Sequence, residues 1–237
     1  MDGSLRRAVS TQAIVEELRS LGCEANRDGM ARFGINVGNA FGVSVTNIRK
    51  IAKRYAGDHQ LAQDLWDTGW HECRILASVI DDPAHVTPPQ MDQWVSDFDS
   101  WDLCDQCCGN LFDKTPFAWK KAVEWSKSEV EFTRRAGFAM MAALARHDKS
   151  APDRKFHPLL RIIEKRSDDN RNFVRKAVNW ALREIGKRNP ALRDQAIATA
   201  ERILARDTPA ARWIARDALR ELNPATAGKR SRQAAAE

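Results

Sequence analysis

Trp101 and Asp105 stand four residues apart in a segment whose apolar positions recur with helical spacing. Residues four apart share one face of a helix, so an indole ring and a carboxylate are expected side by side. A carboxylate next to an aromatic face can bind and stabilise a planar cationic species through its charge and the π-face together. Structural Asp and Trp residues are common, so this pair alone favours such chemistry only modestly.

Arg135 lies off the apolar stripe of its own segment, on a side shared with Ala139 and Ala142. Small neighbours leave room for a bulky partner to approach and for a guanidinium to clamp a phosphate. A plain surface ion pair is the default alternative for any single Arg.

Trp180 lies outside the apolar arc of its helix, in a sector with Phe173, Lys176, Arg183 and Lys187. An aromatic ring flanked by cations is typical of a nucleic-acid stacking site. The alternative, a Trp buried against a neighbouring repeat, is slightly favoured on this helix alone.

Cys104, Cys107 and Cys108 invite comparison with a metal site. Three thiols on adjacent helical turns lack the second ligand cluster of a usual zinc site, so core cysteines are the favoured interpretation. The histidines show no paired ligand spacing, and no nucleotide-loop, nucleophile-elbow or zinc-protease motif is present. The sequence therefore predicts neither a metal nor an organic cofactor.

The segments that must position these residues have helical periodicity almost throughout. Proline-containing breaks separate many of them, and the glycine-rich stretch 34–44 is expected to be a loop or a broken helix. The expected helices lie near 11–21, 44–56, 58–68, 70–80, 88–98, 100–111, 116–127, 129–146, 154–166, 170–187, 190–206 and 208–222.

Two internal similarities indicate a repeat architecture. Phe132-Thr-Arg-Arg-Ala aligns with Phe173-Val-Arg-Lys-Ala at an offset of 41, and 174–185 aligns with 211–222 at an offset of 37. Offsets near 40 match HEAT-like repeats, which stack into a superhelix with a concave binding face. We expect an all-α, right- or left-handed solenoid in one domain over 1–222, followed by a disordered basic tail over 223–237.

The net charge of +6 is distributed unevenly along the chain. Residues 1–128 contain 14 Lys and Arg against 18 Asp and Glu, whereas residues 129–237 contain 24 against 14. A polyanionic partner of the second half and a solvated Arg-rich surface explain this equally well. An odd number of cysteines and the lack of a signal segment or an apolar membrane span predict a cytoplasmic protein with no membrane contact. We also expect the protein to be a monomer.

Three motifs together resemble the AlkD family of alkylpurine DNA glycosylases. They are Ser100-Trp-Asp-Leu-Cys-Asp105, Phe132-Thr-Arg-Arg135-Ala, and the long motif from Phe173 through Trp180 to Glu184. The resemblance spans about 30–189 and implies excision of N3- and N7-alkylated purines, such as 3-methyladenine and 7-methylguanine, from double-stranded DNA. It further implies that no base is flipped into a pocket, unlike in most glycosylases.

The resemblance also assigns roles to residues. The carboxylate of Asp105 would be catalytic, Trp101 and Trp180 would line the cleft, and Arg135 would contact the DNA backbone near the lesion. Phe33 stands near the position where family members often carry a cleft Tyr. The basic residues expected to contact DNA phosphates are Arg135, Arg175, Lys176, Arg183, Lys187 and Arg212.

Two other functions are compatible with such a fold. One is a non-catalytic solenoid that binds damaged or branched DNA, and the other is a protein-interaction scaffold with an acidic partner. A carboxylate inside a basic cleft would weaken binding to a polyanion, so Asp105 favours the glycosylase over both.

Overall fold

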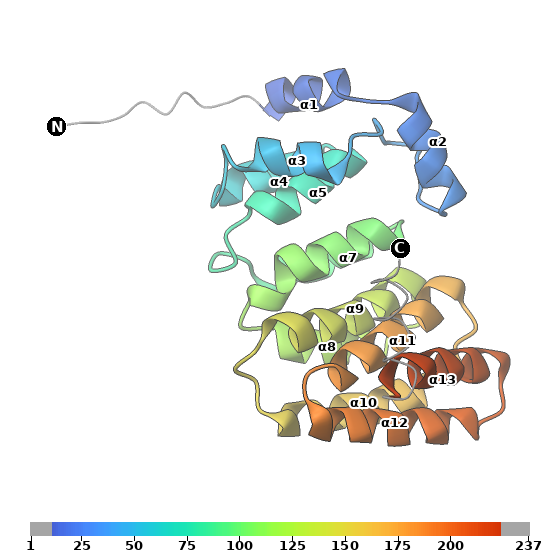
Figure 1. Ribbon diagram of the computed structural model, residues 1–237. Helices are drawn as coiled ribbons and strands as arrows, with labels where there is room; N and C mark the ends of the chain where they lie inside the picture. The colour runs from blue at the N-terminus through green and yellow to red at the C-terminus, as the bar shows by residue number, and fades with distance from the viewer. Residues whose placement is uncertain (1–10, 224–237) are drawn as a thin grey trace, which may run out of the picture. The chain divides into compact units, whose positions relative to one another are not determined.

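A computed structural model describes residues 11–223, and within that range it contains helices and no strand (Figure 1). The chain divides into two compact units, and the boundary along the sequence falls between Thr87 and Pro88. None of the described helices is long and apolar enough to cross a membrane. The all-α class predicted from the periodicity is confirmed, whereas the single domain over 1–222 stays a prediction. Except for Asn223, the expected basic tail lies outside the described residues.

Within residues 11–87, the first unit contains five helices around a small apolar core. They are α1 (Thr11–Ser20), α2 (Glu24–Arg32), α3 (Val45–Ala52), α4 (His59–Asp67) and α5 (His71–Ile80). A buried carboxylate on α5, that of Glu72, accepts hydrogen bonds from the backbone N–H groups of Phe41, Gly42 and Val43. The loop before α3 is therefore tied to α5 by groups that would otherwise be buried without partners.

As far as the structure describes it, to Asn223, the second unit contains eight α-helices. They are α6 (Pro88–Ser96), α7 (Trp101–Asn110), α8 (Ala118–Trp125), α9 (Glu131–His147), α10 (His157–Lys165), α11 (Asn172–Gly186), α12 (Pro190–Leu204) and α13 (Pro209–Leu222). Helix α9 packs between α7 and α11, and α11 in turn packs against α13. We call these four helices the α9 layer. Helix α8 packs on α9. Helices α10 and α12 pack against each other and lie below α11 and α13 in the view of Figure 1.

Helix α9 is the centre of this unit, because every residue from Arg134 to Ala145 is buried. Its approach to the end of α8 depends on Gly137, where an added Cβ would lie 2.3 Å from the backbone nitrogen of Ser126. No side chain fits at that distance, so glycine lets the two backbones meet. The position and rotation of α9 are thereby fixed.

Each expected helix is present, with ends that differ by a few residues. Proline is the first or second residue of α10, α12 and α13, as the breaks in the sequence predicted. Helix α2 was not predicted, because none of its residues is buried and it therefore has no apolar stripe to recognise. Residues 34–44 lie outside any helix, as expected.

Candidate functional site

The carboxylate of Asp105 on α7 is held by the guanidinium of Arg135 on α9. Arg135 Nε donates to Asp105 Oδ1 at 3.0 Å, and Arg135 Nη2 donates to Asp105 Oδ2 at 2.7 Å. Two parallel bonds between a planar guanidinium and a carboxylate fix both position and orientation. The carboxylate can therefore keep one geometry while a ligand binds beside it.

Arg135 also connects α9 to α11. Its Nη1 donates to the backbone carbonyl of Phe173 at 2.6 Å. The Cζ atom of the Arg135 guanidinium lies 5.9 Å from the centre of the Trp101 ring. A single side chain from the central helix thus brings together groups of α7, α9 and α11, the helices that carry the three sequence motifs.

Burial differs between the two partners of this ion pair. The Arg135 side chain is 6% exposed, whereas that of Asp105 is 20% exposed, so the carboxylate is the member that reaches the surface. Burial raises the pKa of Asp105, and the positive charge of Arg135 opposes that rise without cancelling it. Burial also disfavours the charged form of Arg135, but the charge and hydrogen bonds of Asp105, together with contributions from Cys104 and Cys108, outweigh burial and raise the pKa of Arg135.

The cysteines that flank Asp105 attach α7 to α9. The Sγ atoms of Cys104 and Cys108 lie 3.9 Å and 3.7 Å from the carbonyl oxygens of Phe132 and Ala136. Both thiols and that of Cys107 are buried, in agreement with the core interpretation. In the part of the chain that the structure describes, no group of three His, Cys, Asp or Glu residues could hold a metal ion.

Trp180 is half-buried on α11, seven residues after Phe173. Seven residues are close to two helical turns, so both side chains lie on one face of α11, separated along the axis by about 10 Å. The Phe173 ring stacks on that of Phe132 from α9, with ring centres 5.6 Å apart. The structure therefore joins Trp101, Asp105 and Arg135 directly, and it places Trp180 further along the same layer.

Two of the cations expected to contact phosphate are already paired with carboxylates of α13. Arg183 lies 3.0 Å from Asp217 and 2.7 Å from Glu221. Lys187 binds Glu184 at 3.0 Å and also contacts Glu221. A phosphate contact by either residue would compete with these ion pairs, and it stays a prediction.

The other expected cations differ in how available they are. Lys176 is exposed and has no hydrogen-bond or ion-pair partner among residues 11–223. Arg175 lies over the ring of Trp213 on α13, 5.1 Å from its centre, and Arg212 binds Asp207 at 2.6 Å. Lys176 is thus the most accessible of the three for a phosphate contact.

Phe33 lies in the first unit, at the C-terminal cap of α2, and is 73% exposed. The other candidate residues all belong to the second unit, so a shared site with Phe33 stays a prediction.

A second buried ion pair next to the site was not anticipated. Arg134, the neighbour of Arg135, donates to Asp169 at 2.6 Å, and both side chains are less than a tenth exposed. Arg171 binds the same carboxylate at 2.6 Å. These bonds tie α9 to the loop that precedes α11. In the sequence, only the adjacent pair Arg134 and Arg135 pointed to this contact, and Arg135 alone was predicted to be a site residue.

Comparisons with known proteins identify the family and the fold. A family model described as "DNA alkylation repair enzyme" matches residues 14–222. No curated protein matches the chain significantly. A solved structure, described as "A new family of proteins related to the HEAT-like repeat DNA glycosylases with affinity for branched DNA structures", is similar with a TM-score of 0.74. It is 22% identical to this chain, and the match covers 82% of this chain and 83% of the other. The similarity confirms the HEAT-like repeat fold.

Proposed function

Because the chain belongs to the family of DNA alkylation repair enzymes, we propose that it is a DNA glycosylase acting on cationic N3- and N7-alkylated purines. The observation that carries this proposal is the Asp105 carboxylate, partly exposed beside Trp101 and fixed by two hydrogen bonds from Arg135. A partly buried carboxylate held in one geometry is suited to stabilising a developing positive charge.

Excision of an alkylated purine requires little more from the enzyme than stabilisation of the positive charge that develops on the sugar. An N3- or N7-alkylated purine already carries positive charge, and it leaves as a neutral base when the electron pair of the glycosidic bond stays with it. The deoxyribose C1′ then becomes cationic. Asp105 stabilises this cation and orients the water whose oxygen adds to C1′, while a proton is released to solvent. The products are the free base and an abasic site.

The neighbouring residues have supporting roles in this proposal. Arg135 uses one N–H on each Asp105 oxygen, so each oxygen keeps a lone pair for the substrate. Trp101 and Trp180 supply flat apolar surfaces that pack against the sugar of the lesion and displace water. Arg135 is a positioning residue here, because three of its N–H groups are engaged inside the protein.

The direct test is base release from a duplex that contains one N7-methylguanine. We expect the wild-type protein to release the methylated base faster than spontaneous loss, and to leave an unmodified duplex of the same sequence intact. Release at the spontaneous rate with saturating protein would refute glycosylase activity on this lesion.

A second candidate function is binding of branched or damaged DNA without catalysis. The specific observation in its favour is that Arg135 already neutralises much of the Asp105 charge, as a purely structural ion pair would. The structurally similar protein is described as having affinity for branched DNA. This alternative predicts tight binding to a four-way junction and no base release from a duplex that contains N7-methylguanine.

A further inference from the structure

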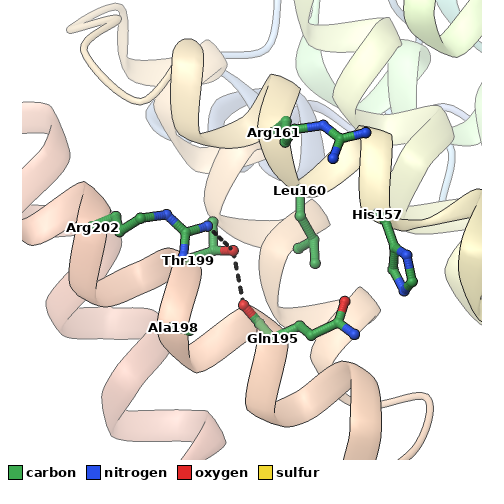
Figure 2. A pocket seen from close by; sticks show the side chains of 7 residues that line it. All are labelled: His157, Leu160, Arg161, Gln195, Ala198, Thr199 and Arg202. Atoms are coloured by element: carbon green, nitrogen blue, oxygen red, sulfur yellow. Dashed lines mark hydrogen bonds between the residues drawn. The ribbon is translucent and has the colours of Figure 1, made fainter.

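A pocket of about 290 Å³ opens between α10 and α12, away from the residues of the candidate site. It is small for a ligand pocket, but its volume approaches the lower end of the usual range of about 300–1,000 Å³. Its lining residues come from two turns of α10 and two turns of α12, and they include His157, Leu160, Arg161, Gln195, Thr199 and Arg202 (Figure 2). Nothing in the proposed glycosylase reaction uses this pocket.

The pocket has two polar groups without partners. The Arg161 side chain is exposed, and no described residue forms an ion pair or a hydrogen bond with it. The Nε2 atom of His157 is buried and likewise has no hydrogen-bond partner within the described range. A buried polar atom without a partner is costly and calls for an explanation, such as a bound ion or water.

The second arginine of the pocket is held in place by its surroundings. Arg202 Nη2 donates to Thr199 Oγ1 at 3.0 Å, and Arg202 Nε donates to Glu164 at 2.8 Å. The Thr199 hydroxyl donates in turn to the backbone carbonyl of Gln195 at 2.8 Å. These bonds leave the N–H groups of Nη1 available on a guanidinium that is already oriented.

The chemistry of the lining selects an anion. It contains two guanidinium groups, an amide and an imidazole, but no carboxylate, over the apolar side chains of Leu160 and Ala198. In Figure 2, Arg161, His157 and Gln195 lie around Leu160. Arg202 lies to the left of Leu160, next to Thr199. Donors on both helices suit a tetrahedral anion, whose oxygens point in several directions, better than a planar carboxylate.

We propose that this pocket binds a phosphate group, with Arg161 and Arg202 as its two cationic contacts. The phosphate belongs either to a small phosphate ester or to the backbone of a nucleic acid, and the chemistry of recognition is the same for both. His157 Nε2 and the Gln195 amide complete the set of polar contacts.

The test measures binding of inorganic phosphate to the full chain by titration calorimetry, at an ionic strength held constant with chloride. The key variant is Arg161→Gln, which removes an exposed, unpaired side chain and leaves the fold undisturbed. Arg154→Gln is the matched control, because Arg154 is also exposed but does not line the pocket. We expect Arg161→Gln to weaken phosphate binding at least tenfold and Arg154→Gln to leave it within twofold.

Two further titrations identify the source of the phosphate. If it belongs to a small ester, deoxyadenosine monophosphate binds more tightly than inorganic phosphate, and Arg161→Gln leaves the affinity for an unmodified duplex unchanged. If it belongs to nucleic acid, Arg161→Gln lowers duplex affinity and inorganic phosphate competes with the duplex. Phosphate affinity that is undetectable, or equal in wild type and Arg161→Gln, would overturn the proposal. This holds whether or not the protein releases alkylated bases.

Discussion

The Asp105 carboxylate must be ionised to stabilise a cation, and its surroundings act on that ionisation in opposite directions. Burial favours the neutral acid, whereas the guanidinium of Arg135 favours the carboxylate. Burial has the larger effect, and the pKa of Asp105 therefore lies above that of an ordinary aspartate. Ionisation of Asp105 therefore requires a higher pH than that of an exposed aspartate.

The first prediction follows from this raised pKa. The rate of base release should fall on the acid side with an apparent pKa above 3.8, the ordinary value for aspartate, because protonation of Asp105 removes the negative charge. Single-turnover rates between pH 4 and pH 8, corrected for spontaneous base loss, measure it. A rate that stays flat down to about pH 4 would show that no carboxylate with a raised pKa controls the reaction.

The second prediction concerns Arg135 as the positioning residue. Arg135→Gln removes the charge that lowers the pKa of Asp105, so the acid limb of the rate profile should move to higher pH. Breaking a buried ion pair should also cost about 3–5 kcal/mol of unfolding free energy. Arg135→Lys keeps the charge but loses the two-bond geometry, so it should restore most of the pH profile and only part of the rate. An acid limb that does not move in Arg135→Gln would separate Arg135 from the ionisation of Asp105.

At the level of the elements, the ion pair between Arg134 and Asp169 holds α9 to the segment before α11. Burial works against the ionised form of Asp169, but hydrogen bonds from Arg171 and Arg134 outweigh it and lower its pKa to about 2. A carboxyl whose pKa is lower in the folded protein stabilises the fold above its unfolded pKa. That stabilisation is lost as the pH falls through the folded value.

The third prediction is therefore a pH-dependent loss of stability in Asp169→Asn. The shift from 3.8 to about 2 corresponds to about 2 kcal/mol at neutral pH. Urea unfolding at pH 7 and at pH 3 measures the loss, which should be smaller at pH 3. Asp194→Asn, at an exposed position of α12, is the control and should change stability by less than about 0.5 kcal/mol. Equal losses at both pH values would mean that the contribution of Asp169 is not that of a charge.

The helices were predictable from the sequence to the extent that their own residues carry the signal. Helices α10, α12 and α13 have proline as their first or second residue, and α11 has a clear apolar arc that includes Val174, Ala181 and Ile185. Helix α2 lacks both signals, since it buries none of its residues. Its helical state was therefore invisible to an argument based on hydrophobic periodicity.

For the whole molecule, the uneven charge distribution is the feature that bears most on DNA binding. The basic half supplies counterion release on binding, so DNA affinity should fall as salt rises. Several of its cations are neutralised by partners within the protein, however, so a count of charges overstates the number of phosphate contacts.

The fourth prediction compares Lys176 within α11 and Lys187 at the C-terminal cap of that helix, which differ in whether a charged partner neutralises them. Lys176 is exposed without a charged partner in the described part of the chain, whereas Lys187 binds Glu184 and Glu221. Lys176→Gln should reduce the slope of log affinity against log salt by about 1, and Lys187→Gln should change it less. Fluorescence anisotropy with a labelled duplex at several chloride concentrations measures both slopes. The reverse order, or affinity independent of salt, would contradict the assignment of phosphate contacts.

The site was predictable only where its residues share one helix. The spacing of Trp101 and Asp105 placed both on one side of α7, and the offset of 41 marked Phe132 and Phe173 as equivalent positions. The bond between Arg135 and Asp105 depends on which helices pack together, and so do the ion pairs of Arg183 with α13. Contacts of that kind follow from tertiary packing, which a single sequence does not specify residue by residue.

The catalytic role of Asp105 is tested most directly by measuring base release and DNA affinity together in Asp105→Asn. Asp102→Asn is the matched control, because it removes the same charge from the same helix and leaves the bonds between Asp105 and Arg135 in place. Loss of one preorganised electrostatic group should cost about 2–4 kcal/mol in the transition state, or roughly a thirtyfold to thousandfold fall in rate. We expect that fall in Asp105→Asn alone, with DNA affinity unchanged or slightly higher. A stable Asp105→Asn protein that binds DNA and releases N7-methylguanine at the wild-type rate would contradict the account.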